Sequence, residues 1–190
     1  MPDTASELRE LLLTAEEAAD LDAPGRTDAA VLVPLYLDGG ELHAVFTKRR
    51  EDLRRHPGEI SFPGGRQDSP EEDLRVTALR EAEEEIGLPR ESVELVGALA
   101  PTPTFVTGYV IHPFVGLIEK GQVWELQPSE VELVLEFSLP ALVRGYESRR
   151  LLRRGVPFRT PTYTVEGQLV WGATARIVQL LLQRLRPLLA

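Results

Sequence analysis

A run of glutamates on one predicted helix constrains this chain more than any other feature of its sequence. We predict a helix over residues 70–86. Ser69 is a typical N-cap, Pro70 suits the first helical position, and Glu72 completes an S-x-x-E capping box. Gly87 supplies the left-handed residue that commonly ends a helix. The helix and the loop before it carry the carboxylates Glu71, Glu72, Glu81, Glu84 and Glu85.

The helical period divides these residues between two faces. At about 100° per residue, the apolar face consists of Val76, Leu79, Ala82 and Ile86. The opposite face carries Glu81, Glu84 and Glu85. Three carboxylates so close together repel one another, and near a helix C-terminus the macrodipole also disfavours negative charge. A hard divalent cation such as Mg²⁺ or Mn²⁺ removes this repulsion through oxygen ligands. The alternative interpretation is a solvated acidic helix face.

A pair of glycines leads into the predicted helix. Residues 61–65 end an apolar stretch at Gly64 and Gly65. Glycine permits unusual backbone angles and a close approach of the backbone to a ligand. A carbonyl oxygen from this loop could therefore join the carboxylates as a metal ligand, and the metal site is favoured over the solvated face.

The spacing of these residues resembles the signature of the Nudix hydrolases, G-x5-E-x7-R-E-U-x-E-E-x-G-U, in which U is a bulky apolar residue. Residues 80–88 match its second half. The first half departs by one position, because Arg66 stands where the glycine is expected and Gly65 comes one residue early. Glu72 then takes the place of the early glutamate, with Glu71 as the alternative.

A second motif lies upstream, within residues 45–65. It resembles L-L-T-x-R-[S/A]-x3-R-x3-G-x3-F-P-G-G, which accompanies the Nudix box in coenzyme A pyrophosphatases. The matching residues are Thr47, Arg49, Arg54, Gly58, Phe62, Pro63, Gly64 and Gly65. Arg50 departs from the motif, which has a small residue there, and we interpret it as a bystander.

The same segment forms a cationic patch in a chain of net charge −9. The patch consists of Lys48, Arg49, Arg50, Arg54 and Arg55. Guanidinium groups stay charged and bind phosphate bidentately, as a substrate with several phosphates requires. The alternative interpretation is a basic loop that balances the acidic helix.

The resemblance implies hydrolysis of a pyrophosphate linkage with Mg²⁺ as cofactor, or Mn²⁺ in its place. The implied metal ligands are Glu81, Glu84, Glu85 and a carbonyl of Gly64 or Gly65. The implied substrate-binding residues are Lys48, Arg49, Arg54 and Arg55, together with the two glycines. Arg80 is expected to hold Glu72 or another glutamate in place. Residues 128–132 resemble an N-P-x-E-V segment of the same proteins, so Glu130 is expected as an outer metal ligand or a water-activating base, with a surface glutamate as the alternative.

The resemblance also implies the substrate. This is coenzyme A in its free, oxidised or acylated form, cleaved to 3′,5′-ADP and 4′-phosphopantetheine or its derivative. The alternatives are another nucleoside diphosphate derivative, such as ADP-ribose, NADH or a dinucleotide, and a Nudix module that binds ligand without hydrolysis. The R-E-x-x-E-E core is complete at residues 80–85, which favours catalysis.

Composition sets the remaining limits. The 190 residues, 43% of them hydrophobic, are expected to form one domain over residues 1–190. The acidic balance argues against a nucleic-acid backbone as partner. The chain has no cysteine, no apolar segment of membrane-spanning length and no secretory charge pattern near residue 1, so a cytoplasmic protein is the default. A homodimer through the N-terminal helix or the sheet edges is plausible.

The order of predicted elements indicates an α/β protein, and the resemblance implies the Nudix α/β/α sandwich with a mixed sheet between helices. One helix is expected at about residues 5–19, and the Nudix box spans residues 64–88. Residues 149–154 are expected to form a basic loop. Strands are predicted at residues 29–37, 42–47, 93–99, 109–118, 131–137, 162–165 and 169–171, and further helices at residues 139–143 and 173–185.

Overall fold

The central sheet is built on the hairpin of β1 (Thr27–Asp38) and β2 (Glu41–Arg49). Gly39 and Gly40 turn the chain between them with φ of 58° and 90°, angles that favour glycine. The computed structural model describes residues 3–54, 56–104, 108–153 and 156–189. Within them, this hairpin positions the cationic segment, because β2 ends at the start of that segment.

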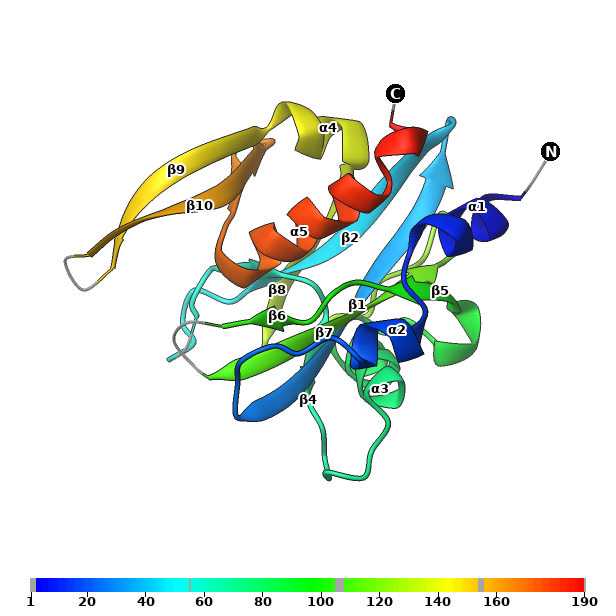
Figure 1. The fold of residues 1–190 in the computed structure, drawn as a ribbon, viewed down its shortest axis with the longest axis horizontal. Helices are drawn as coiled ribbons and strands as arrows, with labels where there is room; N and C mark the ends of the chain where they lie inside the picture. Colours follow the sequence, from blue (N-terminus) through cyan, green and yellow to red (C-terminus); the bar gives the residue numbers. More distant parts are fainter. Residues whose placement is uncertain (1–2, 55, 105–107, 154–155, 190) are drawn as a thin grey trace.

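The sheet is mixed, as the sequence predicts. β1 pairs in parallel with β7, whereas the other pairings in this sheet are antiparallel (Figure 1). The main path runs β3-β2-β1-β7-β5, with β4 on β1, β6 on β7 and β8 on β2. The strands that join the hairpin are β3 (Ile60–Ser61), β4 (Gly64–Arg66), β5 (Glu94–Ala98), β6 (Thr102–Pro103), β7 (Tyr109–Leu117) and β8 (Val131–Ser138).

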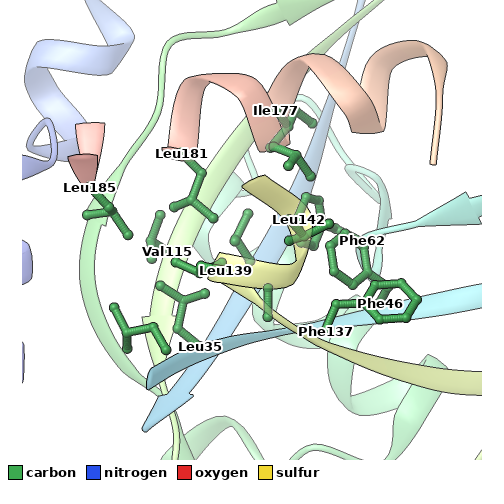
Figure 2. Close-up of a cluster of buried hydrophobic side chains, with 14 of the residues drawn as sticks. Leu35, Phe46, Phe62, Val115, Phe137, Leu139, Leu142, Ile177, Leu181 and Leu185 are labelled. Carbon is green, nitrogen blue, oxygen red and sulfur yellow. The ribbon is translucent and has the colours of Figure 1, made fainter. Parts of the chain in front are cut away.

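Helices cover both faces of this sheet. Alternate residues of β1 point to opposite faces, as the period of a strand requires. Val33 and Leu35 belong to a core with α1 (Thr4–Leu11), α4 (Leu139–Arg144) and α5 (Gly172–Arg184). Figure 2 shows this core beneath α4 and α5. Ala30, Leu32 and Tyr36 belong to a second core with α2 (Ala15–Ala19) and α3 (Leu74–Ile86). The α/β/α arrangement is therefore confirmed.

A smaller sheet of β9 (Tyr146–Arg153), β10 (Val156–Val165) and β11 (Gln168–Val170) follows. Figure 1 shows the hairpin of β9 and β10 projecting from the body of the molecule. The predicted basic loop at residues 149–154 is thus wrong over residues 149–153, which belong to β9; residue 154 lies outside the described residues. Antiparallel pairing with β10 imposes the extended conformation that the arginine-rich composition does not indicate.

The single N-terminal helix predicted at residues 5–19 is also wrong, because the structure has two helices there. The backbone N–H and C=O of Leu13 pair with Ala98 at N···O distances of 3.2 and 2.8 Å. This pairing prevents the helix from continuing. A new helix, α2, then starts from a capping box in which Thr14 and Glu17 bond each other's backbone N–H groups.

The acidic helix α3 begins later than predicted. Its N-cap is Asp73, whose carboxylate accepts a hydrogen bond from the backbone N–H of Arg75. Ser69 belongs to a preceding turn, where its carbonyl accepts from the N–H of Glu72. The predicted capping box does not form, because the Glu72 carboxylate bonds other groups. The predicted end is confirmed, since Gly87 is the C-cap with φ of 68°.

The strand predicted at residues 162–165 is the end of the longer β10, which begins at residue 156, and the remaining predicted strands and helices lie within a few residues of their expected positions. Short 3₁₀ helices occur at η1 (Arg90–Ser92) and η2 (Arg186–Leu188). Among the described residues, no helix combines the length and the apolar character needed to cross a membrane.

Candidate functional site

The buried face of α3 brings its carboxylates to the edge of the sheet. Ala78, Ala82 and Ile86 are fully buried in the core shared with β1. Val76, predicted on the apolar face, is 44% exposed, so that assignment is wrong. The face is rotated away from Val76, and the two alanines let the helix lie close to the strand. Glu85 consequently lies at the margin of the buried face.

The glycine pair lies in β4 directly against this helix. Gly64 and Gly65 pair with Val31 and Ala30 of β1. A Cβ atom on Gly65 would overlap the carboxylate of Glu81, and one on Gly64 would overlap the backbone of β1. The two glycines are therefore required by space: they let the backbone touch the strand on one side and a predicted metal ligand on the other.

Glu85 is the most deeply buried of the predicted ligands, with 8% of its surface exposed. Burial first, and then the neighbouring charges of Glu81 and Glu130, raise the pKa of its carboxyl to about 8. Arg49 and a backbone hydrogen bond from Gly64 oppose the rise. A buried carboxylate among other carboxylates is stable only with a proton or a cation beside it.

Glu81 lies beside Glu85 and faces Gly65. Burial also raises the pKa of Glu81, while the charge and hydrogen bond of Arg80 lower it. The Nη1 atom of Arg80 is 3.0 Å from Oε1 of Glu81. Glu81 therefore interacts with the guanidinium of Arg80 and also with its acidic neighbours. We call Glu81, Glu84, Glu85 and Glu130 the carboxylate cluster, or acidic cluster.

Arg80 is 12% exposed and binds several oxygens at once. Its Nε lies 3.2 Å from Oε1 of Glu72, and its Nη2 donates to the carbonyl of Arg66 at 3.0 Å. Glu72 also accepts from the N–H of Asp68 and the hydroxyl of Thr77, at 2.8 and 2.9 Å. Hydrogen bonds from Arg80, Asp68 and Thr77 hold the pKa of Glu72 at about 2. The expected Arg80–Glu72 pair is present, and Glu72, not the exposed Glu71, makes it.

Glu84 is more exposed and turns toward Arg80, with Oε2 3.4 Å from Nη1. In the described part of the chain, no three or more His, Asp or Glu side chains converge closely enough to hold a metal ion. The donors nevertheless suit Mg²⁺ or Mn²⁺, because all are oxygens and Glu85 lacks a hydrogen-bonded cationic partner within the described residues.

The end of β2 adds a cation to this acidic cluster. The Nη1 of Arg49 lies 3.6 Å from Oε2 of Glu130, and its charge also reaches Glu85. The buried Nε of Arg49 has no hydrogen-bond partner within the described residues. Lys48 forms long ion pairs with Glu51 and Glu132, at 3.7 and 3.8 Å. Arg49 is thus a cationic donor with spare hydrogen-bonding capacity at the carboxylates.

Of the remaining cationic residues, Arg54 is exposed, and Arg55 lies outside the described residues. Arg50 is bound to Asp52 and to the carbonyl of Pro128. The bystander interpretation concerns phosphate binding and stays a prediction, whereas the contact with Pro128 was not foreseen, because that residue lies far along the chain. Sequence reasoning also missed Thr77, whose buried hydroxyl bonds Glu72.

A cavity of about 520 Å³ lies between α2, the start of α3 and β7. It includes Glu72 and His112 in its wall, but none of Arg49, Glu81 or Glu85. Because the carboxylate cluster lies outside it, we locate the candidate site at the glycine pair and not in this cavity.

The chain is similar to known proteins across most of its length. The sequence pattern of the NUDIX domain matches residues 26–153. The Nudix hydrolase NudL of Enterobacter sp. (strain 638) is 38% identical over 160 residues, covering 83% of this chain and 82% of that protein. NudL of Salmonella paratyphi B is 39% identical over 153 residues, covering 80% and 79%.

Two solved structures share the fold at low sequence identity. The NUDIX domain of Shewanella oneidensis NrtR, complexed with ADP ribose, has a TM-score of 0.56 and 17% identity, covering 93% of this chain and 98% of that one. A MutT/nudix family protein from Enterococcus faecalis has a TM-score of 0.57 and 14% identity, covering 98% and 76%.

Proposed function

This chain belongs to the Nudix hydrolase family, and on that premise we propose that it hydrolyses the diphosphate of coenzyme A. The products are 3′,5′-ADP and 4′-phosphopantetheine, or the corresponding derivative when the substrate is oxidised or acylated. The family assignment covers hydrolysis of nucleoside diphosphate derivatives. The choice of coenzyme A rests on the motif of residues 47–65 described above.

One observation carries the proposal: a cationic residue of that motif lies at the carboxylate cluster. Arg49 is close to Glu130 and to the buried Glu85, and its Nε has no partner within the described residues. A diphosphate needs both kinds of group, because carboxylates hold the cation that neutralises the reacting oxygens and guanidinium groups bind the others. The position of Arg49 supports a site that receives such a substrate.

Nudix hydrolases generally use divalent metals such as Mg²⁺. In this chain Glu81, Glu84 and Glu85 would hold the ion, with a carbonyl of Gly64 or Gly65. Bound Mg²⁺ or Mn²⁺ supplies Lewis acidity and lowers the pKa of a water molecule, so that a nucleophile is available at neutral pH.

The side chains around the cation orient the substrate and accept the proton that the attacking water releases. Arg49 and Arg54 bind oxygens of the non-reacting phosphates, and Lys48 adds positive charge to the same surface. Arg55 belongs to this set by sequence. Glu130 accepts a proton from the attacking water or holds the cation in an outer position.

Arg80 acts through other residues. Its bonds to Glu72 and to the carbonyl of Arg66 fix the start of the helix relative to β4. It therefore keeps Glu81 opposite Gly65.

The test is turnover with Mg²⁺ or Mn²⁺ of coenzyme A beside ADP-ribose, NADH and diadenosine polyphosphates, with products separated by chromatography. We expect 3′,5′-ADP from coenzyme A at the highest kcat/KM. Preference for another compound would refute the substrate and retain the hydrolase. Lack of turnover with every compound would favour a Nudix module that only binds ligand.

A matched pair of variants tests the observation on Arg49. Arg49→Ala should raise KM for coenzyme A about tenfold or more, because a charge-assisted hydrogen bond contributes roughly 1.5–3 kcal/mol. Arg75→Ala removes an exposed arginine that pairs with Asp73 outside the carboxylate cluster, and should leave KM unchanged. Equal KM values for Arg49→Ala and the unmodified protein would exclude Arg49 from substrate binding.

A further inference from the structure

We propose that Arg50 is a positioning residue. It holds the turn at residues 128–130, which carries Glu130, beside the other carboxylates of the cluster. This inference rests on the role proposed for Glu130. The motif of coenzyme A pyrophosphatases has a small residue where this chain has Arg50. The contacts of the Arg50 side chain are therefore a feature of this chain and not of the motif.

Arg50 contacts the turn through two separate groups. Its Nη1 donates to the carbonyl of Pro128 at 2.8 Å, and its backbone N–H donates to the carbonyl of Glu130 at 3.1 Å. The guanidinium is itself oriented by Asp52, whose two oxygens accept from Nε and Nη2 at 2.8 and 2.7 Å. A bidentate pair of this kind fixes the plane of the guanidinium. The third donor is consequently aimed at Pro128.

The turn is anchored on its other side to the end of α3. The N–H of Gln127 donates to the carbonyl of Glu85 at 2.9 Å, and that of Glu125 donates to the carbonyl of Ile86 at 3.0 Å. The Gln127 carbonyl then accepts from Glu130 and Val131, at 3.0 and 2.9 Å. The turn therefore bridges the helix that carries the acidic cluster and the end of β2.

Arg49, the last residue of β2, and Arg50, which follows it, contact different parts of this turn. Arg49 points to the Glu130 carboxylate, with Nη1 and Oε2 3.6 Å apart, whereas Arg50 binds the backbone of the same turn. The register between β2 and β8 shifts between Lys48 and Arg49. Such irregularities re-aim side chains and are common beside active sites. Glu130 is thus held from its backbone by one arginine and faced at its carboxylate by the other.

We call the contacts of Arg50 with this turn the clamp. Hydrogen exchange, measured without substrate, tests whether the clamp holds the turn in place. In Arg50→Ala, peptides covering residues 125–131 should exchange about tenfold faster, because one of the two hydrogen bonds from Arg50 to the turn is lost. Arg149→Ala is the matched control, since Arg149 also pairs with an acid two residues away and both arginine side chains are 41% exposed. Unchanged exchange in Arg50→Ala would refute the clamp, whatever the substrate.

A double-mutant cycle tests the positioning role in catalysis. With the best substrate of the panel above, Arg50→Ala should lower kcat about tenfold at unchanged KM, while Arg149→Ala changes neither. In a Glu130→Gln background the Arg50 substitution should have no further effect, because both act through one carboxylate. Arg50→Lys should restore part of the rate by donating to Pro128.

The outcomes distinguish the positioning role of Arg50 from the role proposed for Glu130. Additive losses from Arg50→Ala and Glu130→Gln would refute positioning while leaving Glu130 in its proposed role. A Glu130→Gln variant with the unmodified rate would remove that role and the inference with it. Should Arg50→Ala fail to fold, Asp52→Ala provides the second variant, because it frees the guanidinium while retaining the arginine; unchanged exchange of residues 125–131 in this variant would refute the clamp.

Discussion

Glu72 lies just before α3 and Glu85 lies in its last turn, and their surroundings shift the pKa of their carboxyl groups in opposite directions. At the entrance of α3, Glu72 accepts hydrogen bonds from Arg80, Asp68 and Thr77, and its pKa is about 2. In the last turn, Glu85 is buried near other acids, and its pKa is about 8. The first carboxylate is satisfied by the fold, and the second is not.

This difference separates a carboxylate that stabilises the fold from one that is available to bind a ligand. We call the first, Glu72 with its partner Arg80, the brace. A carboxylate whose two oxygens both accept hydrogen bonds from the fold, as in Glu72, stabilises the loop around it and has little capacity left for a ligand. A buried carboxylate without hydrogen-bonded cationic support costs stability, and such groups cluster at functional sites. Glu85 therefore belongs to the proposed chemistry, whereas Glu72 belongs to the scaffold that positions it.

The largest effect should come from Glu85→Gln. We expect turnover to fall by about three orders of magnitude, because loss of a ligand to the cation removes several kcal/mol of charge stabilisation in the transition state. Steady-state kinetics with Mg²⁺, at saturating substrate, measure the loss. The fold should persist, since glutamine has nearly the same shape and can still accept a backbone hydrogen bond.

Glu72→Gln is the counterpart that sharpens the comparison. It should reduce turnover far less than Glu85→Gln and should reduce stability instead. Equal losses of turnover in the two variants would break the distinction between brace and binding group.

Arg80→Ala tests the brace from its cationic side. Arg80 is 12% exposed and supports Glu72, Glu81 and a backbone carbonyl. Its removal leaves partly buried carboxylates unpaired, so we expect unfolding in urea to show a loss on the order of 2 kcal/mol. Arg75→Ala, which breaks an exposed pair, should cost less than about 1 kcal/mol.

The pH dependence of stability should reveal Glu85 directly. Its pKa is raised in the folded state, so its protonated form is favoured by folding. The associated stability is fully present below the pKa of the unfolded chain, near 4.5, and is lost as pH rises through about 8. In buffers containing a chelator, the Tm should therefore fall on the order of 10 °C between pH 5 and pH 9 because of this group.

Two comparisons make this fall specific. Glu85→Gln should remove this part of the decrease, and added Mg²⁺ should reverse it in the unmodified protein. A decrease of the same size in Glu85→Gln would assign it to other groups and would leave burial of Glu85 without an energetic consequence.

Local sequence signals predicted much of the fold because short-range chemistry decides those elements. The Gly39–Gly40 turn and the Gly87 helix stop follow from the backbone angles that glycine permits. The expected pairing of Arg80 with Glu72 or another glutamate is also confirmed, and it lies between the helix and the loop before it.

Failures arose where a distant partner decides the local structure. Leu13 ends the first helix by pairing with Ala98, and residues 149–153 extend because β10 pairs with them. The contact of Arg50 with the carbonyl of Pro128 was not predicted, because the two residues are remote in sequence. Which carboxylate lies next to which cation depends on contacts of this long-range kind, and these cannot be read from spacing along the chain.

The smallest effect should be the acid sensitivity that Glu72 confers. Its pKa is lowered in the folded state, so its stabilising contribution is present above the unfolded value, near 4.5, and is lost as pH falls toward 2. Urea unfolding at pH 6 and pH 3 should show a larger loss for the unmodified protein than for Glu72→Gln, because glutamine does not titrate. Parallel losses in both proteins would mean that the Arg80, Asp68 and Thr77 contacts do not hold the carboxylate in solution, and the contrast with Glu85 would then rest on burial alone.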